Sequence, residues 1–202
     1  MNYIQKFFGH LKTVCIHKWW VFYYCCKFGM PITGLLHDLS KFSPTEFFES
    51  VKYYSGTRSP IDACKEDIGW SRAWMHHKGR NKHHYEYWQD NFDNGGEPLL
   101  MPFKYNLEML CDYLGAGRAY NGKKFTYEGE YEWWTSKTQK PLAMHPVNRR
   151  FIDKMLYDLT CIYIFSTSNI RRGRRYTARD FAEHKYKQVV EEWNNGKTIC
   201  NI

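Results

Sequence analysis

Apolar side chains recur at helical spacing along the first part of the chain. Ile4, Phe7, Leu11 and Val14 follow the three-to-four-residue period of one helix face. Since residues 3–28 contain few Gly or Pro residues, this pattern predicts a long N-terminal helix. The segment Gly29-Met30-Pro31 predicts its end, because Gly favours helix C-termini and Pro follows them.

A second apolar stripe predicts another helix over residues 32–42. Its apolar side is expected to carry Ile32, Leu35, Leu36 and Leu39. The segment Ser43-Pro44-Thr45-Glu46 then has the form of a capping box with Pro at the first helical position. We therefore expect a third helix from Pro44 to about Tyr54, and we assign Glu46 to its cap.

The rest of the chain also favours helices. Residues 61–78 are expected to be helical with a break before Gly69, and Asn81 is expected to cap a helix that runs through Trp88. Further helices are predicted at 103–119, 147–168 and 177–194, whereas residues 121–148 look less regular. Because the alternation typical of strands is weak throughout, the sequence predicts an all-α fold. We expect residues 1–120 to form a helical core, with residues 121–202 packing on it as an irregular segment plus C-terminal helices.

The charge of the chain favours anionic partners. The 202 residues carry a formal net charge of +8, which suits phosphates, nucleotides or nucleic acid but is also compatible with an ordinary solvated surface. The basic run over residues 171–175 is interpreted as surface. No zinc finger or RNP motif supports direct nucleic-acid recognition. No P-loop or GxGxxG is present either, which argues against nucleotide-binding folds of those types.

The cysteines and the hydropathy predict a cytoplasmic protein without membrane spans. The seven cysteines are odd in number and lack metal-ribbon spacing, which favours free thiols in a reducing compartment. No apolar stretch is long enough to span a bilayer, and no signal peptide is evident. The oligomeric state is left open.

Histidines gather in two short segments and predict a metal centre. His37 precedes Asp38, and four further histidines lie at positions 76, 77, 83 and 84. Imidazole and carboxylate ligands together suit Fe, Mn, Zn or Ni better than Mg or Ca. Asp112 is an acid on an otherwise apolar helix, which is costly unless it is paired or binds metal. On the first helix His17 is the preferred ligand, with His10 as the alternative.

The ordered pattern H … HD … H … H … D resembles that of the HD-domain metal-dependent phosphohydrolase superfamily. More closely, the chain resembles a bacterial and phage family of unknown function. The hallmarks of that family are HDLSKFSPxEF, SxAWxHHKGRNKHHxEYW and MPxKYxxEMxCD, which occur here at residues 37–47, 71–88 and 101–112.

The superfamily resemblance implies a helical bundle with one or two divalent ions, of Mn, Fe, Ni, Co or Zn. The implied metal ligands are His17, His37, Asp38, His77, His84 and Asp112. Asp38 and Lys41 would then act in catalysis. The ammonium group of Lys41 can neutralise phosphoryl oxygens in the transition state. The residues expected to contact substrate are Arg80, Asn81, His76 and His83.

These features predict hydrolysis of a small phosphate ester such as a nucleotide. Two other hypotheses are compatible with the sequence. One is a di-iron oxygenase, because some proteins with an HDxxK element use iron and oxygen on small polar substrates. The other is a non-catalytic protein that binds a nucleotide or a nucleic acid through its basic surface.

Overall fold

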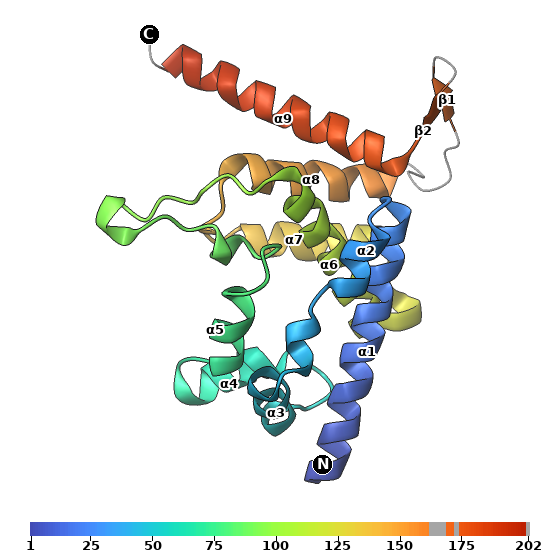
Figure 1. Cartoon of the computed structure of the whole chain (residues 1–202), viewed down its shortest axis with the longest axis vertical. Coiled ribbons are helices and arrows are strands. Elements are labelled where there is room, and N and C mark those ends of the chain that lie inside the picture. Colours follow the sequence, from blue (N-terminus) through green and yellow to red (C-terminus); the bar gives the residue numbers. More distant parts are fainter. Residues whose placement is uncertain (162–168, 172–173, 201–202) are drawn as a thin grey trace.

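Helices account for nearly all of the regular structure in the computed structural model, which describes residues 1–161, 169–171 and 174–200 (Figure 1). The described elements are α1 (Tyr3–Lys27), α2 (Pro31–Leu36), η1 (Leu39–Phe42), α3 (Pro44–Tyr53), α4 (Pro60–Ile68), α5 (Arg72–Lys78), η2 (Tyr85–Tyr87), η3 (Phe92–Asn94), α6 (Phe103–Asn121), η4 (Gly122–Lys124), α7 (Tyr127–Thr138), α8 (Pro146–Cys161), β1 (Asn169–Arg171), β2 (Arg174–Tyr176) and α9 (Ala178–Cys200). The all-α prediction is confirmed, with one short antiparallel hairpin of β1 and β2 added. No helix in the described part of the chain is long and apolar enough to cross a membrane.

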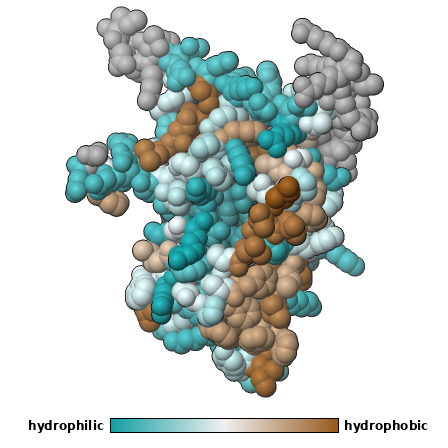
Figure 2. Space-filling view, viewed as in Figure 1, coloured by the Kyte–Doolittle hydropathy of each residue, from teal (hydrophilic) through white to brown (hydrophobic). Residues whose placement is uncertain are grey.

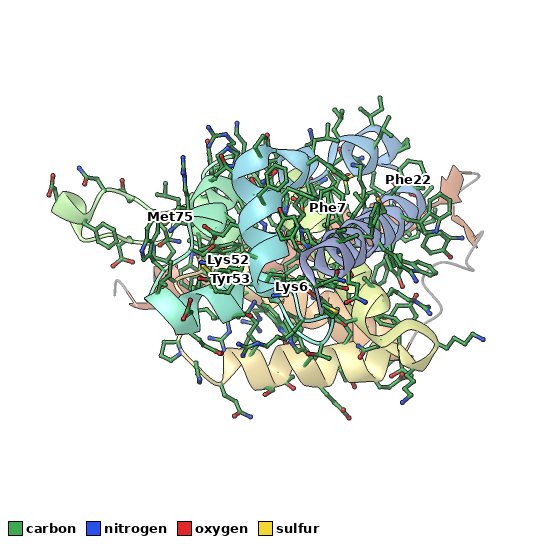
Figure 3. The ribbon with its side chains drawn as sticks, turned by 90° about the horizontal axis from the view of Figure 1, so that it is seen from below. Lys6, Phe7, Phe22, Lys52, Tyr53 and Met75 are labelled. Carbon is green, nitrogen blue, oxygen red and sulfur yellow. The ribbon has the colours of Figure 1, made fainter. Side chains whose placement is uncertain are left out.

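The predicted N-terminal helix is confirmed as α1. Asn2 accepts a hydrogen bond from the backbone N–H of Gln5, and the Gln5 side chain accepts one from the Asn2 N–H, which satisfies two free donors of the first turn. Gly29 follows the helix with a positive φ of 68°, as its predicted role as a stop requires. Near its start α1 is tied to α3, because Lys6 Nζ donates to the backbone oxygen of Lys52 at 2.8 Å (Figure 3).

The predicted helix over residues 32–42 is wrong. α2 ends at Leu36, His37 turns into an extended conformation with ψ of 131°, and Asp38 has a left-handed φ of 53°. The short helix η1 follows. The carbonyl groups of Leu35 and His37 at this break accept hydrogen bonds from Lys18 Nζ at 2.7 and 2.8 Å, so these two acceptors are paired.

The apolar stripe of this segment also lies elsewhere than expected. Ile32, Leu35 and Leu36 are exposed to 73, 60 and 58% rather than buried. Together with exposed side chains of α1, they form a brown band on the face shown in Figure 2. Contiguous apolar surface of this kind is uncommon on soluble monomers.

The predicted helix from Asn81 through Trp88 is wrong as well. Residues 79–84 form turns, in which the N–H groups of Arg80 and Asn81 donate to the carbonyl of His77. The Asn81 amide also donates to this carbonyl at 2.9 Å, so it closes the end of α5 rather than capping a new helix. Only η2 follows.

The region 121–148 is more regular than predicted, because it contains the twelve-residue helix α7. Thr126 caps that helix by accepting from the N–H of Gly129 at 3.0 Å. The helices predicted at 147–168 and 177–194 are found as α8 and α9, although residues 162–168 lie outside the described ones. Of the basic run over residues 171–175, Arg171 ends β1 and Arg174 and Arg175 lie in β2, whereas residues 172–173 and the side chains of the run lie outside the described part.

One buried apolar cluster holds α1, α6, α7, α8 and α9 together. It contains Val21, Leu110, Trp134, Phe151 and Ala182, each at most 1% exposed. These residues lie on both sides of position 120, so the C-terminal helices share a core with the first half of the chain. Among the described residues, six cysteines are free thiols, as predicted. They are Cys15, Cys25, Cys26, Cys64, Cys111 and Cys161.

Candidate metal centre

Four ligand-type side chains meet between α1, α6 and the break after α2. His17 Nε2 lies 3.1 Å from Asp112 Oδ1, and His37 Nε2 lies 3.3 Å from both Asp112 Oδ1 and Asp38 Oδ2. One candidate ligand atom from each of these four residues lies within 4.8 Å of the others. Spacing of this kind suits several donors around one cation.

A second group shares Asp38 with the first. Asp38 Oδ1 lies 3.4 Å from the Nε2 atoms of His77 and His83, and the Nε2 atoms of His77 and His84 are 2.9 Å apart. Again these side chains place ligand atoms within 4.8 Å of one another. Because the two oxygens of Asp38 face different groups, this carboxylate can bridge two ions.

A surrounding layer of carboxylates fixes the rings. Glu108 Oε1 accepts a hydrogen bond from His37 Nδ1 at 3.0 Å and lies 3.4 Å from His83 Nδ1. Glu46 Oε2 accepts from His77 Nδ1 at 2.8 Å. With their Nδ1 atoms engaged in this way, these rings direct Nε2 toward Asp38, which is how carboxylates commonly orient histidine ligands of metals.

The breaks in the helices place these groups. His37 and Asp38 follow the end of α2, and Asp38, with its positive φ, directs its carboxylate toward His17 of α1 and His77 of α5. A non-glycine residue in this conformation carries strain that often marks a functional site. The turns after α5 likewise bring His83 and His84 next to His77, although the helix predicted there is absent.

The centre combines burial with unpaired polar atoms. The Nε2 atoms of His17, His37 and His83 and Oδ1 of Asp38 are buried and form no hydrogen bond of acceptable geometry within the described part of the chain. Buried polar atoms are normally paired, so this concentration needs an explanation. Several lone pairs converging on one region fit divalent cations, and the residues present therefore suit such ions.

Burial and neighbouring charges shift the pKa values of several side chains in the cluster. Burial disfavours the imidazolium of His37, but the carboxylates of Asp38 and Asp112 outweigh it and raise the pKa of that ring well above its usual value. Burial likewise opposes the charge of Asp38, and His37 and Lys41 lower its pKa well below the usual range. Burial and the neighbouring imidazoles lower the pKa of His84 well below its usual value, which favours the neutral ring that binds metals.

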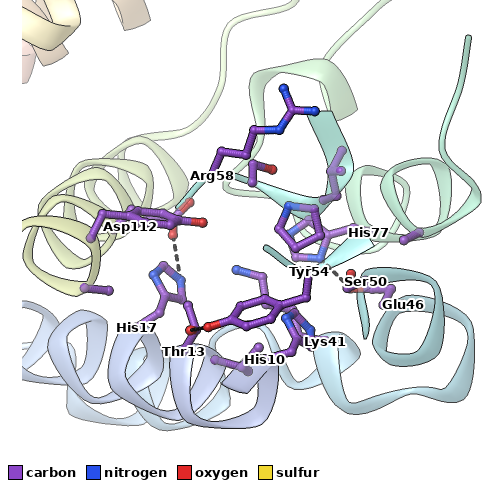
Figure 4. A pocket seen from close by; sticks show the side chains of 18 of the residues that line it. His10, Thr13, His17, Lys41, Glu46, Ser50, Tyr54, Arg58, His77 and Asp112 are labelled. Atoms are coloured by element: carbon purple, nitrogen blue, oxygen red, sulfur yellow. Dashed lines mark hydrogen bonds and ion pairs between the residues drawn. The ribbon is translucent and has the colours of Figure 1, made fainter. Parts of the chain in front are cut away.

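A cavity of about 380 Å³ opens onto this cluster, within the size range of small-molecule sites. Figure 4 shows its wall, where His17 and Asp112 face each other and Lys41 lies close to His10. Lys41 Nζ lies 2.6 Å from Asp38 Oδ2. The predicted position of this lysine on one helix with His37 is wrong, since η1 is separate from α2.

The alternative first ligand, His10, lies in this wall and outside both groups. Its ring packs on Phe47 and Tyr54, with centroids 5.1 and 5.8 Å away. Burial and the charge of Lys41 lower its pKa to about 4. The geometry therefore places His17, not His10, with the other candidate ligands.

None of the four residues expected to contact substrate lines the cavity. His83 instead joins the second ligand group, and His76 Nδ1 donates to Glu46 Oε1 at 2.6 Å. Asn81 donates to Ser40 Oγ at 2.9 Å, and Arg80 is exposed. The cavity wall includes His77 and His84 from the predicted ligand set.

Sequence reasoning missed the roles of Glu46 and Glu108. Ser43 Oγ accepts from the N–H of Glu46 as a cap, but the Glu46 carboxylate turns to the histidines of α5 instead of completing the capping box. Glu108 lies four residues before Asp112 and hence on the same face of α6, a spacing that could have identified it.

The fold and the site together define an all-α protein with a buried histidine and carboxylate cluster beneath a cavity. The chain belongs to a family of unknown function, DUF5662, whose model matches residues 6–158. This range includes both ligand groups. No curated protein and no solved structure matched the chain.

Proposed function

We propose that this chain is a metal-dependent phosphohydrolase that binds two divalent ions and hydrolyses a small phosphate ester such as a nucleotide. The observation that supports it most strongly is the pair of ligand groups sharing Asp38, with carboxylates behind the rings. The order of these ligands along the chain resembles that of HD-domain phosphohydrolases.

In this proposal one ion is held by His17, His37, Asp38 and Asp112, and the other by Asp38, His77, His83 and His84. Divalent ions there would polarise phosphoryl oxygens and make a water molecule more acidic at neutral pH. Glu46 and Glu108 hold the imidazole rings in place. Lys41, beside Asp38 and in the cavity wall, neutralises charge that develops on the phosphoryl group.

The test removes the shared ligand. We expect Asp38→Ala and His37→Ala to lose bound metal and phosphatase activity together while keeping their helical circular dichroism. Metal content is measured by elemental analysis, and phosphate release from a nucleotide and sugar-phosphate panel is measured with added Mn²⁺, Co²⁺ or Ni²⁺. His184→Ala, at an exposed position on α9, is the matched control and should retain both. Full metal content in the Asp38 and His37 variants would contradict the ligand assignment.

The number of imidazoles supports one second candidate, an iron-dependent oxygenase. Five histidines contribute to the two groups, and imidazole is a good ligand for iron. Anaerobic loading with Fe²⁺, followed by exposure to oxygen, separates the two candidates. A visible charge-transfer band without phosphate release from any ester supports the oxygenase and contradicts the hydrolase.

A further inference from the structure

A lysine on α7 reaches the same cavity from another side. Lys137 lines the cavity and is half-buried. Its Nζ lies 5.2 Å from the ring centroid of Tyr113 and 5.0 Å from that of Trp133. These aromatic faces hold the ammonium group in position through cation–π attraction.

Lys137 differs from the other two cations of the cavity wall. Lys41 is paired with Asp38, and Arg58 Nη1 lies 2.6 Å from Glu66 Oε2. For Lys137, no carboxylate oxygen of the described residues lies within 4 Å. Burial lowers its pKa, so the protein bears a cost for keeping this charge at the cavity.

The two lysines act at different parts of the cavity. Lys41 belongs to η1 and contacts the shared carboxylate directly. Lys137 belongs to α7, and its Nζ lies against the rings of Tyr113 and Trp133 rather than against the shared carboxylate. A group bound by Lys137 would therefore contact a part of the cavity wall that Lys41 does not supply.

We propose that the substrate carries a second anionic group, a carboxylate or phosphate, and that Lys137 binds this group while the phosphoryl group to be cleaved lies beside Asp38 and Lys41. This inference rests on the proposed function. It assigns Lys137 to substrate selection, because a cation that meets only the remote anion favours doubly anionic esters over singly anionic ones.

The test compares matched ligands that differ by one anionic group. The pairs are glycerol 3-phosphate with 3-phosphoglycerate, and adenosine 5′-monophosphate with adenosine 3′,5′-bisphosphate. Binding to Mn²⁺-loaded protein is measured by calorimetry for the wild type, Lys137→Met, Lys137→Arg and the exposed control Lys140→Met. We expect Lys137→Met to weaken the doubly anionic member of at least one pair about tenfold, near 1.4 kcal/mol, and to spare its partner. Lys137→Arg should largely restore the preference.

The outcomes separate this inference from the proposed function. Equal weakening of both members by Lys137→Met places the lysine at the reacting phosphoryl group and overturns the inference. The same holds if the wild type prefers no doubly anionic ligand. Selective binding without hydrolysis of any ester contradicts the phosphohydrolase instead and leaves the anion subsite supported.

An independent observation concerns the opposite side of the segment that carries His37 and Asp38. We define the apolar face as Ile4, Phe8, Ile32, Leu35, Leu36, Leu39 and Phe42, all between 40 and 73% exposed. Seven large apolar residues exposed to this extent make a surface comparable in size to what each partner contributes to a standard interface. The band is continuous in Figure 2.

Most of the lysines beside this face are engaged elsewhere. Lys6 and Lys18 donate to backbone carbonyls, and Lys41 pairs with Asp38, whereas Lys12, one turn after Phe8 on α1, is exposed. With three of these amines engaged, most of the face carries no charge and adds little repulsion between two copies. We infer that two copies of this chain pack through the apolar face in a symmetric dimer, since a two-fold axis places apolar surface on apolar surface.

Sedimentation of the full chain tests this inference. We expect a dimer at micromolar concentration, and Leu35→Glu should raise the dissociation constant at least 100-fold with unchanged circular dichroism. Phe92→Glu, which changes a side chain 85% exposed on η3, should remain dimeric. A monomeric wild type overturns the inference, whether or not it binds phosphatidylserine vesicles.

Discussion

Glu130 is a buried acid outside the metal centre. It lies on α7, is 5% exposed, and its carboxylate lies against Gly117 of α6. Burial, followed by the negative charge of Asp112, raises its pKa to about 7. The folded protein therefore keeps the proton of this group at pH values where an unfolded chain releases it.

Replacing this acid by its neutral counterpart should change the pH dependence of stability. Between pH 4.5 and about 7 the folded state binds the extra proton, so Glu130 costs stability as the pH rises through that window. We expect Glu130→Gln to raise the free energy of unfolding by up to about 3 kcal/mol at pH 8 and to have little effect at pH 4.5. Urea unfolding at both pH values measures this difference.

The control for this change is Glu128→Gln, at an exposed position two residues earlier in the same helix. It should show no such dependence on pH. An equal gain from Glu130→Gln at pH 4.5 and pH 8 would mean that packing, and not the proton, accounts for the effect.

At single positions, the sequence could identify residues with ligand chemistry but not which residues lie next to them in the fold. The histidine-rich segments and Asp112 predicted a cluster, because imidazoles next to acids are rare without a reason. Lys137 could not be identified in this way. It lies 25 residues beyond Asp112 in a helix that was not expected, and only the fold brings it to the cavity.

Between elements, the crossing of α1 and α6 decides whether the first ligand group forms. Gly115 permits it, since a Cβ atom there would lie 2.5 Å from Val21 Cγ2 and 2.9 Å from the Val21 backbone nitrogen. Gly115 is three residues from Asp112 on the same helix face. The contact between His17 and Asp112 thus depends on this close approach.

We expect Gly115→Ala to force the two helices apart. The clash should lower the free energy of unfolding by about 1–3 kcal/mol and weaken metal binding, because His17 and Asp112 separate. Thermal unfolding and equilibrium metal titration measure the two effects. Gly196→Ala is the matched control, since nothing lies within 4 Å of a Cβ there and Ala favours helix by roughly 0.5–1 kcal/mol. Unchanged metal affinity in Gly115→Ala would contradict the idea that metal binding depends on the close approach of α1 and α6.

Element ends were predictable where caps and prolines mark them, as at Gly29 and Pro44. The break at His37 was not, because its apolar neighbours keep a helical period although they are exposed. α7 was missed for a related reason. Trp134 and Glu130 are its only buried residues, so the helix shows no apolar stripe in the sequence.

In the whole molecule, the ligand groups lie between two parts of the fold that share little apolar core. The main buried cluster draws its residues from α1 and α6–α9 and the segments beside them, whereas α3, α4 and α5 contribute none to it and lie at the other end in Figure 1. His77 comes from α5, and Glu46 behind it comes from α3. His17 and Asp112 come from the helices of the main core.

At the boundary between these two parts, polar groups hold the helices together, as apolar packing does in the main core. Asp38 lies within 4 Å of histidines from both parts, so cations bound on its two oxygens would join α5 to α1 and α6. Binding that needs both parts in place stabilises the state in which they are assembled. This arrangement also explains why hydrophobic periodicity predicted the helices of the core better than the turns around the centre. The conformation of these turns follows from the positions at which ligand atoms converge, and the spacing of apolar residues along the sequence does not predict those positions.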